Sequence, residues 1–313
     1  MSKIAQRNAF GEALLEQGRK NNKVCVVNAD LGSPTKTKAF TKEFPERSFD
    51  VGIAEENGIS TAAGLALSGL RPFFVSFAVF TSSNYDQNRM SVAYSKAPVV
   101  LVGTHGGLIG KDGGSHQALE DINIMSGLPG MSVYQPADPL ETRQIVEYLA
   151  KNNEMAYLRL SRHPQENVHK KGYNFVPGKA EVLEFSPNSN AVLFSTGYIT
   201  THALEAAKGL SKEGFPIDVV NFSTLHPKGI DKELITNYAM QGPNHIITIE
   251  DHNPTGGLGS RVCEVIAEKG LNAKVLRLGV DSFGESGSPE DLYKKYNLDP
   301  ESIAKKVKSF TFS

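Results

Sequence analysis

A glycine-rich segment, Thr104 to Gln117, carries His105, Asp112 and His116 directly after an apolar run. Imidazole and carboxylate side chains can bind substrate hydroxyl groups, and histidine can transfer protons near neutral pH. Loops held on a rigid frame commonly carry such functions, although the same residues could also serve only as scaffold. The segment is therefore a candidate substrate site.

Two adjacent acids, Glu55 and Glu56, stand where a helical pattern begins. The structural interpretation is a favourable interaction with the helix dipole, of about 0.3–1 kcal/mol. The functional interpretation is a carboxyl group that hydrogen-bonds a ring nitrogen of a heterocyclic ligand. Phe77 and Phe80 follow the next apolar run and are either core residues or an apolar wall against a flat ring.

Arg162 follows a further apolar run and is either a solvated surface residue or a phosphate ligand, because its planar guanidinium matches phosphate oxygens. The glycine-rich segments match neither of two nucleotide-binding motifs. Residues 106–114 lack the spacing of a P-loop, and in residues 255–260 the place of the third dinucleotide glycine is taken by Val262. The glycines therefore do not indicate a nucleotide site.

The elements that must hold these residues alternate between short apolar runs and helical patterns, which predicts parallel sheets covered by helices, an α/β fold. In the first half, the predicted strands are 24–28, 73–77, 98–102 and 132–135, and the predicted helices are 3–20, 56–68, 84–95 and 138–150. In the second half, the predicted strands are 191–195, 217–222, 245–249 and 274–278, and the predicted helices are 199–212, 231–240 and 259–269. We predict one domain over residues 1–165, a polar linker over 166–180 and a second domain over 181–313.

Composition narrows the class of protein. Apolar residues make up 40% and charged residues 21%, as in globular proteins with buried cores. The net charge of −1 argues against a nucleic-acid partner, and no run reaches the roughly 18 apolar residues of a membrane span. Cys25 and Cys263 lie far apart in apolar patterns, which favours reduced cysteines and a cytoplasmic location.

Taken together, these segments resemble the transketolase family over nearly the whole chain. The family's strand, Gly-x-x-Glu, helix pattern matches residues 52–55, and Gly-Leu-Arg-Pro at 69–72 is common to the superfamily. Thr104-His105 with Asp112, and Ser161-Arg162, are similar to transketolase itself. Residues 249–260 resemble the signature of the family's C-terminal domain.

This resemblance implies a thiamine diphosphate cofactor and a role for each matching residue. Glu55 would bind the cofactor's pyrimidine ring, with catalysis shared by His105 and His116. Phe77 and Phe80 would pack on that ring, and Asp30 would also contact the cofactor. The implied substrate-binding residues are Arg7, Ser33, His105, Asp112, His116 and Arg162, with Arg7, Ser33, His105 and Arg162 around a sugar phosphate group.

The chain lacks a Gly-Asp-Gly with a downstream Asn, so it has no magnesium-diphosphate site of the thiamine type of its own. The resemblance therefore implies the C-terminal subunit of a split transketolase. A separate N-terminal subunit would hold Mg²⁺, in an α2β2 assembly that moves a two-carbon ketol unit between sugar phosphates. The alternatives are a β subunit of a 2-oxo acid dehydrogenase, a deoxyxylulose-phosphate-synthase-like enzyme, and a non-catalytic regulatory subunit of the same fold.

Overall fold

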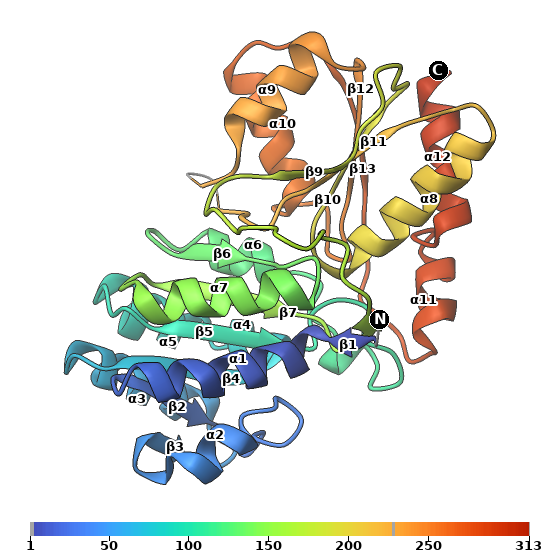
Figure 1. Cartoon of the computed structure of the whole chain (residues 1–313). Helices are drawn as coiled ribbons and strands as arrows, with labels where there is room; N and C mark the ends of the chain where they lie inside the picture. Colours follow the sequence, from blue (N-terminus) through green and yellow to red (C-terminus); the bar gives the residue numbers. More distant parts are fainter. Residues whose placement is uncertain (1–2, 227–228, 313) are drawn as a thin grey trace.

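A computed structural model describes residues 3–226 and 229–312, and it divides into two stacked α/β units (Figure 1). The first unit is built on a six-stranded sheet of order β3-β2-β4-β5-β7-β6, in which every neighbouring pair is parallel. Its strands are β2 (Val24–Asn28), β3 (Ser48–Asp50), β4 (Arg71–Phe77), β5 (Val100–Thr104), β6 (Ser132–Tyr134) and β7 (Ala156–Leu160). Central strands such as β2 are buried along their whole length, as expected where helices cover both faces.

Helices cover both faces of this sheet (Figure 1). The helices are α1 (Gln6–Lys20), α2 (Lys38–Glu43), α3 (Glu55–Leu67), α4 (Ala78–Ser83), α5 (Tyr85–Gln87), α6 (Asp121–Ser126) and α7 (Pro139–Lys151). Helices α1 and α7 pack on one face, while α3 and α6 pack on the other. Helix α7 starts where Asp138 accepts the Glu141 N–H and Pro139 fixes the first turn.

The second unit contains a five-stranded sheet of order β13-β12-β10-β11-β9. Its strands are β9 (Glu181–Glu184), β10 (Val192–Ser195), β11 (Asp218–Asn221), β12 (His245–Ile249) and β13 (Lys274–Leu278). Its helices are α8 (Thr200–Lys212), α9 (Lys232–Gln241), α10 (Leu258–Glu268), α11 (Pro289–Lys295) and α12 (Pro300–Thr311). Helices α8 and α12 cover one face, and α9 and α10 cover the other, where the apolar core continues into the α3 and α6 side of the first unit.

The predicted α/β class is confirmed, with three local differences. Strand β9 pairs antiparallel with β11, so the second sheet is mixed; its short, largely exposed sequence gave no buried-strand pattern. The predicted helix 84–95 is instead the short α5 followed by a π-helix, Asn88–Tyr94. The elements that were not predicted are helices α2, α4, α6, α11 and α12 and the two-stranded pair of β1 (Ile4–Ala5) and β8 (Pro164–Gln165).

The polar stretch 166–180 packs against the first unit. Phe175 is buried with the core residues of α1 and α7. The buried His169 lies 2.9 Å from a carboxylate oxygen of Asp138, and Tyr173 donates to Glu141 at 2.7 Å. The stretch is therefore polar because its polar groups pair with the start of α7.

Candidate cofactor and substrate site

The predicted site residues gather at the carboxyl edge of the first sheet, where ligands bind in open α/β sheets. Phe77 ends β4, Thr104 ends β5, and Arg162 follows β7. The chain reverses its direction along the sheet between β2 and β4, because β3 lies outside β2 while β4 lies on its other side. The residues that follow β2 and β4 therefore flank the switch point of the sheet.

An aromatic wall stands at this edge. Phe77 and Phe80 are stacked, with ring centroids 5.7 Å apart and an interplanar angle of 10°. The His105 ring lies 3.9 Å from Phe77, and His116 meets Phe80 edge-on at 5.3 Å. Both phenylalanines are half-buried, so they are accessible aromatic surface and not interior core residues. This geometry suits a flat ring ligand.

Glu55 is the first residue of α3 and is half-buried, whereas Glu56 is exposed. The hydroxyl of Ser76, in β4, donates a long hydrogen bond of 3.4 Å to Oε1 of Glu55. The carbonyl of the same Ser76 accepts the Thr104 hydroxyl at 3.2 Å. Ser76 thus joins the carboxyl group to the strand that carries His105.

The contacts of His105 define the protonation of its ring. Arg7 donates from Nη1 to Nε2 at 2.8 Å, so that nitrogen must offer a lone pair. Thr104 Oγ1, which already donates to Ser76, accepts from Nδ1–H at 2.9 Å. Burial, followed by the nearby Arg7 and Arg162, lowers the pKa of His105 to about 3. The ring is therefore a neutral Nδ1–H tautomer at physiological pH.

Two cations lie side by side at this site. Arg162 pairs with Asp112, and Arg7 also donates to the Pro34 carbonyl at 3.2 Å. Burial and then the Arg162 charge lower the pKa of Arg7. Nε of Arg7 is buried and has no hydrogen-bond partner within residues 3–226 and 229–312. A pair of arginines with an unpaired buried donor fits an anionic ligand.

Ser33 and Asp30 have fewer contacts with the other predicted site residues. Ser33 is exposed and precedes Pro34, whose carbonyl binds Arg7. Asp30 adopts a positive φ of 57° after β2 and donates its N–H to Asp50. In the described part of the chain, the Asp30 carboxylate makes no hydrogen bond to another predicted site residue. The structure therefore places Ser33 next to the residue that binds Arg7 and leaves Asp30 on the loop after β2.

A buried ionic network below the site was missed by the sequence analysis. Arg159, in β7, binds Asp121 and Asp251 at 2.8 Å each, and all three are almost fully buried. Burial alone would lower the pKa of Arg159, but the two carboxylates outweigh it and raise the pKa. The available signal was a charged residue inside the otherwise apolar run Ala156–Leu160.

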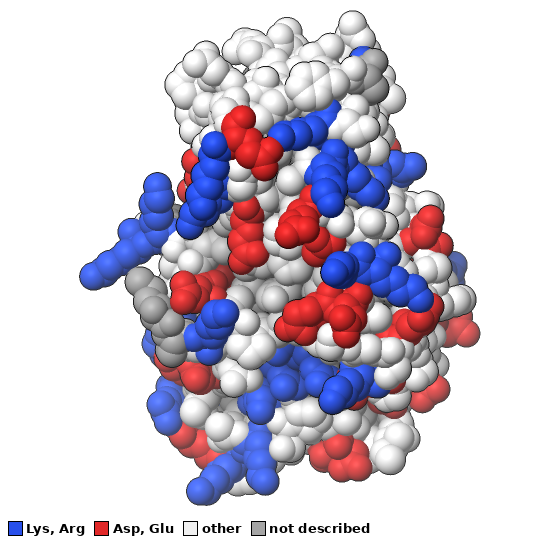
Figure 2. Space-filling model, turned by 90° about the vertical axis from the view of Figure 1, so that its right-hand side faces the viewer, with Lys and Arg blue, Asp and Glu red and all other residues white. Residues whose placement is uncertain are grey.

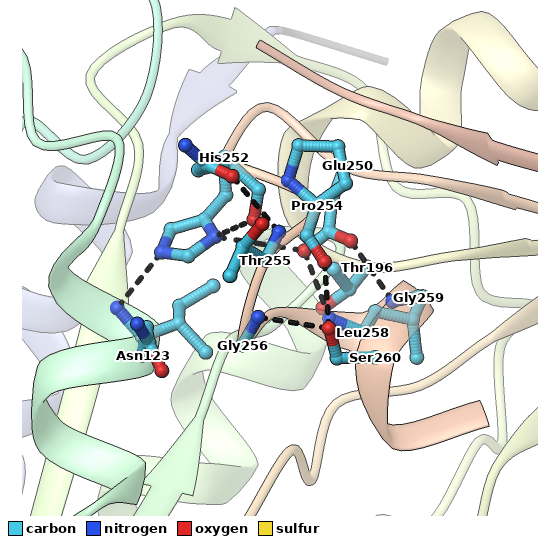
Figure 3. A network of polar contacts seen from close by, with 12 residues as sticks. Asn123, Thr196, Glu250, His252, Pro254, Thr255, Gly256, Leu258, Gly259 and Ser260 are labelled. Carbon is cyan, nitrogen blue, oxygen red and sulfur yellow. Dashed lines mark hydrogen bonds and ion pairs between the residues drawn. The ribbon is translucent and has the colours of Figure 1, made fainter. Parts of the chain in front are cut away.

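The segment 249–260, which resembles the signature of the family's C-terminal domain, forms contacts within the chain (Figure 3). Glu250 accepts the N–H groups of Leu258 and Gly259 at the start of α10, and burial raises its pKa to about 7. His252 Nε2 accepts the Ile122 N–H from the first unit at 3.2 Å, and burial lowers its pKa to about 4. This segment therefore joins the two units.

Other surfaces carry none of the predicted site residues. A cavity of about 740 Å³, lined by Tyr94, Pro98 and Met155 among others, opens at the opposite edge of the first sheet. Acidic and basic side chains are interspersed over the face in Figure 2. Within the described ranges, no cluster of three His, Cys, Asp or Glu residues could hold a metal, and no helix could cross a membrane.

Comparison with known proteins agrees with this architecture. The pyrimidine-binding domain of transketolase matches residues 2–165, and the transketolase C-terminal domain matches residues 178–303. A "Putative transketolase C-terminal section" from Methanocaldococcus jannaschii is 40% identical, over 96% of this chain and 94% of that protein. A 6-deoxy-6-sulfo-D-fructose transketolase subunit from a Clostridium species (strain MSTE9) is 34% identical, over 97% and 94%.

A solved structure described as a split gene transketolase, inactive beta4 tetramer, superposes with a TM-score of 0.88 at 38% identity, covering 99% of both chains. The match therefore covers both units, in the same order along the chain. The chain belongs to the transketolase family, as a subunit of a thiamine-diphosphate-dependent, transketolase-like enzyme that carries the pyrimidine-binding and C-terminal domains.

Proposed function

We propose that this chain, together with a separate N-terminal subunit, transfers a two-carbon ketol unit from a ketose phosphate to an aldose phosphate. One observation carries the proposal. Arg7, Arg162 and the neutral His105 converge beside the aromatic wall, and Nε of Arg7 is buried without a partner. Such a group is suited to a phosphate whose sugar reaches toward a ring cofactor on the phenylalanines.

The residues present fit the pyrimidine half of thiamine diphosphate. Phe77 and Phe80 supply a stacked apolar surface, and the half-buried Glu55 is within reach of Ser76 at the start of α3. When bound, thiamine diphosphate would supply the carbanion chemistry that breaks and forms the carbon–carbon bond. Glu55 would hold a proton toward the ring nitrogen, and the phenylalanines would exclude water from that face.

The remaining residues divide into phosphate ligands and hydroxyl ligands. Arg7 and Arg162 would bind the phosphate, helped by Ser33, because guanidinium groups bind phosphate oxygens in pairs. Asp112, beside Arg162, would accept a hydrogen bond from a sugar hydroxyl group. Since the low pKa keeps His105 neutral, it would act through hydrogen bonding, whereas His116 would move protons. Asp30 would contact the cofactor from the loop after β2.

Two features support a partner chain for the diphosphate and Mg²⁺. The sequence has no Gly-Asp-Gly with a following Asn, and the first unit exposes large apolar side chains, which include Ile53 beside Glu55 and Leu67 at the other end of α3. Tyr85, Met90 and Tyr94 are further exposed large apolar residues of the first unit. The related split-gene transketolase is described as an inactive beta4 tetramer. That description fits a chain that associates with itself but needs a second subunit for activity. We infer an α2β2 assembly. The division of the chain into two domains joined by residues 166–180 stays a prediction.

The test is reconstitution. The chain is assayed alone and with a candidate N-terminal subunit that contains the diphosphate motif, with thiamine diphosphate and Mg²⁺, for transfer from xylulose 5-phosphate to ribose 5-phosphate. We expect activity only from the mixture. Glu55→Gln should lose at least about 100-fold in kcat, while the matched control Glu56→Gln retains activity.

Each alternative makes a different prediction in this assay. Transfer by the single chain would overturn the two-subunit proposal. Activity on 2-oxo acids, with no dependence on Arg7 or Arg162, would indicate a dehydrogenase β subunit. Condensation of pyruvate with an aldehyde would indicate a deoxyxylulose-phosphate-synthase-like enzyme. Wild-type activity of Glu55→Gln would indicate that this chain is regulatory.

A further inference from the structure

A segment of the second unit lies directly on the loop that carries the predicted substrate residues. We call residues 104–117 the site loop and residues 281–288 the brace. Gln117 of the site loop donates from Nε2 to the Glu285 carbonyl at 3.0 Å and to the Gly110 carbonyl at 3.1 Å. Ser286 of the brace donates to the Lys111 carbonyl at 2.7 Å. The two segments are therefore joined by hydrogen bonds on both sides.

Glycines let the two backbones approach this closely. A Cβ atom on Gly114 would lie 2.3 Å from the Gly284 carbonyl oxygen, and a Cβ on Gly284 would lie 1.6 Å from Oε1 of Gln117. Gln117 is only 2% exposed and is held by its two hydrogen bonds, so it has little freedom to move aside. The contact thus depends on small residues on both sides.

Both the base of the site loop and the brace are fixed to the second unit. A Cβ on Gly107 would lie 2.1 Å from the buried Asp251, which follows β12 and is held by Arg159. The brace is attached to α11 and the residue after it, because Tyr296 donates to the Phe283 carbonyl at 3.3 Å and Lys295 pairs with Glu285 at 2.6 Å. The site loop therefore rests on a surface that is itself anchored.

We propose that the brace positions the site loop, and that Gln117 and Ser286 are positioning residues for the substrate contacts of Asp112 and His116. Lys111, whose carbonyl accepts from Ser286, precedes Asp112, and Gln117 follows His116. Displacement of Lys111 would therefore move Asp112, and displacement of Gln117 would move His116, which are both proposed substrate-binding residues. The inference rests on the proposed function for its kinetic consequence, and it gives the second unit a role in substrate affinity.

Two variants test the brace in the full chain, assayed with its partner subunit. Ser286→Ala removes one hydrogen bond, and Gly284→Ala forces Gln117 out of place. Gly209→Ala is the matched control, because a Cβ there meets nothing within 4 Å. We expect KM for the donor sugar phosphate to rise about 3- to 10-fold in both test variants. In Ser286→Ala, which acts next to Asp112, kcat should change much less, whereas in Gly284→Ala kcat should fall as well because displacement of Gln117 also moves His116. A merely structural role would instead reduce the active fraction and lower kcat at constant KM.

Hydrogen exchange on the chain alone provides a second measurement that does not depend on catalysis. Backbone amides of residues 108–116 should exchange about 3- to 10-fold faster in Ser286→Ala than in the wild type, while Gly209→Ala changes nothing there. Unchanged exchange together with unchanged KM in Ser286→Ala would overturn the inference, even if Gly284→Ala fails to fold. Faster exchange in Ser286→Ala, together with a wild-type assembly that transfers no two-carbon unit, would support the brace and reject the proposed function.

Discussion

Arg7 donates a hydrogen bond to His105 over 2.8 Å, and this contact joins the first turn of α1 to the end of β5. A cation that donates to Nε2 opposes protonation of the ring, in addition to the effect of burial on the His105 pKa. The same guanidinium keeps Nε unpaired, so it can bind the neutral histidine and an anion together. The pair thus links the proposed phosphate subsite to the aromatic wall.

Replacing Arg7 should separate phosphate affinity from the rest of the reaction. We expect Arg7→Ala to raise KM for a phosphorylated donor at least about 10-fold, because hydrogen bonds to charged groups contribute roughly 1.5–3 kcal/mol. A two-carbon donor without phosphate, such as hydroxypyruvate, should be affected much less. Arg19→Ala is the control, since Arg19 forms an exposed pair with Glu43 on the same helix. Equal losses with both donors would contradict a phosphate role.

Thr104 should fix the tautomer of His105. Thr104→Val keeps the shape but removes the hydroxyl that accepts from Nδ1–H and donates to Ser76. We expect nitrogen NMR to show a mixture of His105 tautomers in the variant, and kcat/KM to fall about 10-fold with the cost of an unsatisfied buried donor. Thr41→Val, on the exposed side of α2, serves as control. A single unchanged tautomer in Thr104→Val would show that Arg7 alone determines it.

The first unit was largely predictable because its strands are short apolar runs that end at chemically distinctive residues. Strand β2 of this unit was predicted with the bounds that the structure shows, as were β12 and β13 of the second unit. The position of Phe77, Thr104 and Arg162 at one edge followed from the rule that parallel strands end together. Local periodicity was sufficient where burial on both faces gave a clear pattern.

The contacts between the units were not predictable in the same way. Arg159, Asp121 and Asp251 are far apart in the sequence, and only tertiary structure brings their charges together. The brace was missed because residues 281–288 have no periodicity, and their effect depends on where Gln117 lies in space. Strand β9 was missed because an exposed edge strand lacks the alternation that burial imposes.

The buried Glu250 should make stability depend on pH. Its pKa is raised to about 7 in the folded chain from an ordinary value of 4.5, so the folded state favours the protonated acid. The stabilisation that the protonated Glu250 gives to the folded state is fully present below about pH 4.5 and is lost as the pH rises through about 7. The free energy of unfolding should fall by roughly 3 kcal/mol in total from this effect.

The melting temperature of Glu250→Gln relative to wild type should therefore increase between pH 4.5 and 7, since the variant has nothing to ionise. Glu264→Gln, on the outer surface of α10, should show no such trend. Both variants are measured on the chain alone, and because the histidines are the same in wild type and variants, their contribution cancels in the difference in melting temperature. A constant difference across that range would mean that Glu250 ionises normally.

Gly257 should be intolerant of a side chain, because the start of α10 closes on Glu250 at that point. A Cβ atom there would lie 1.8 Å from Oε2 of Glu250, which already accepts the Leu258 N–H at 2.8 Å. We expect Gly257→Ala to lower the free energy of unfolding by about 1–3 kcal/mol, the usual range for overpacking in a close-packed interior. Gly209→Ala, in the open part of α8, should be neutral or slightly stabilising, because alanine is the better helix former. Denaturant unfolding of both variants measures the difference, and equal stabilities would show that the Glu250 contact yields without cost.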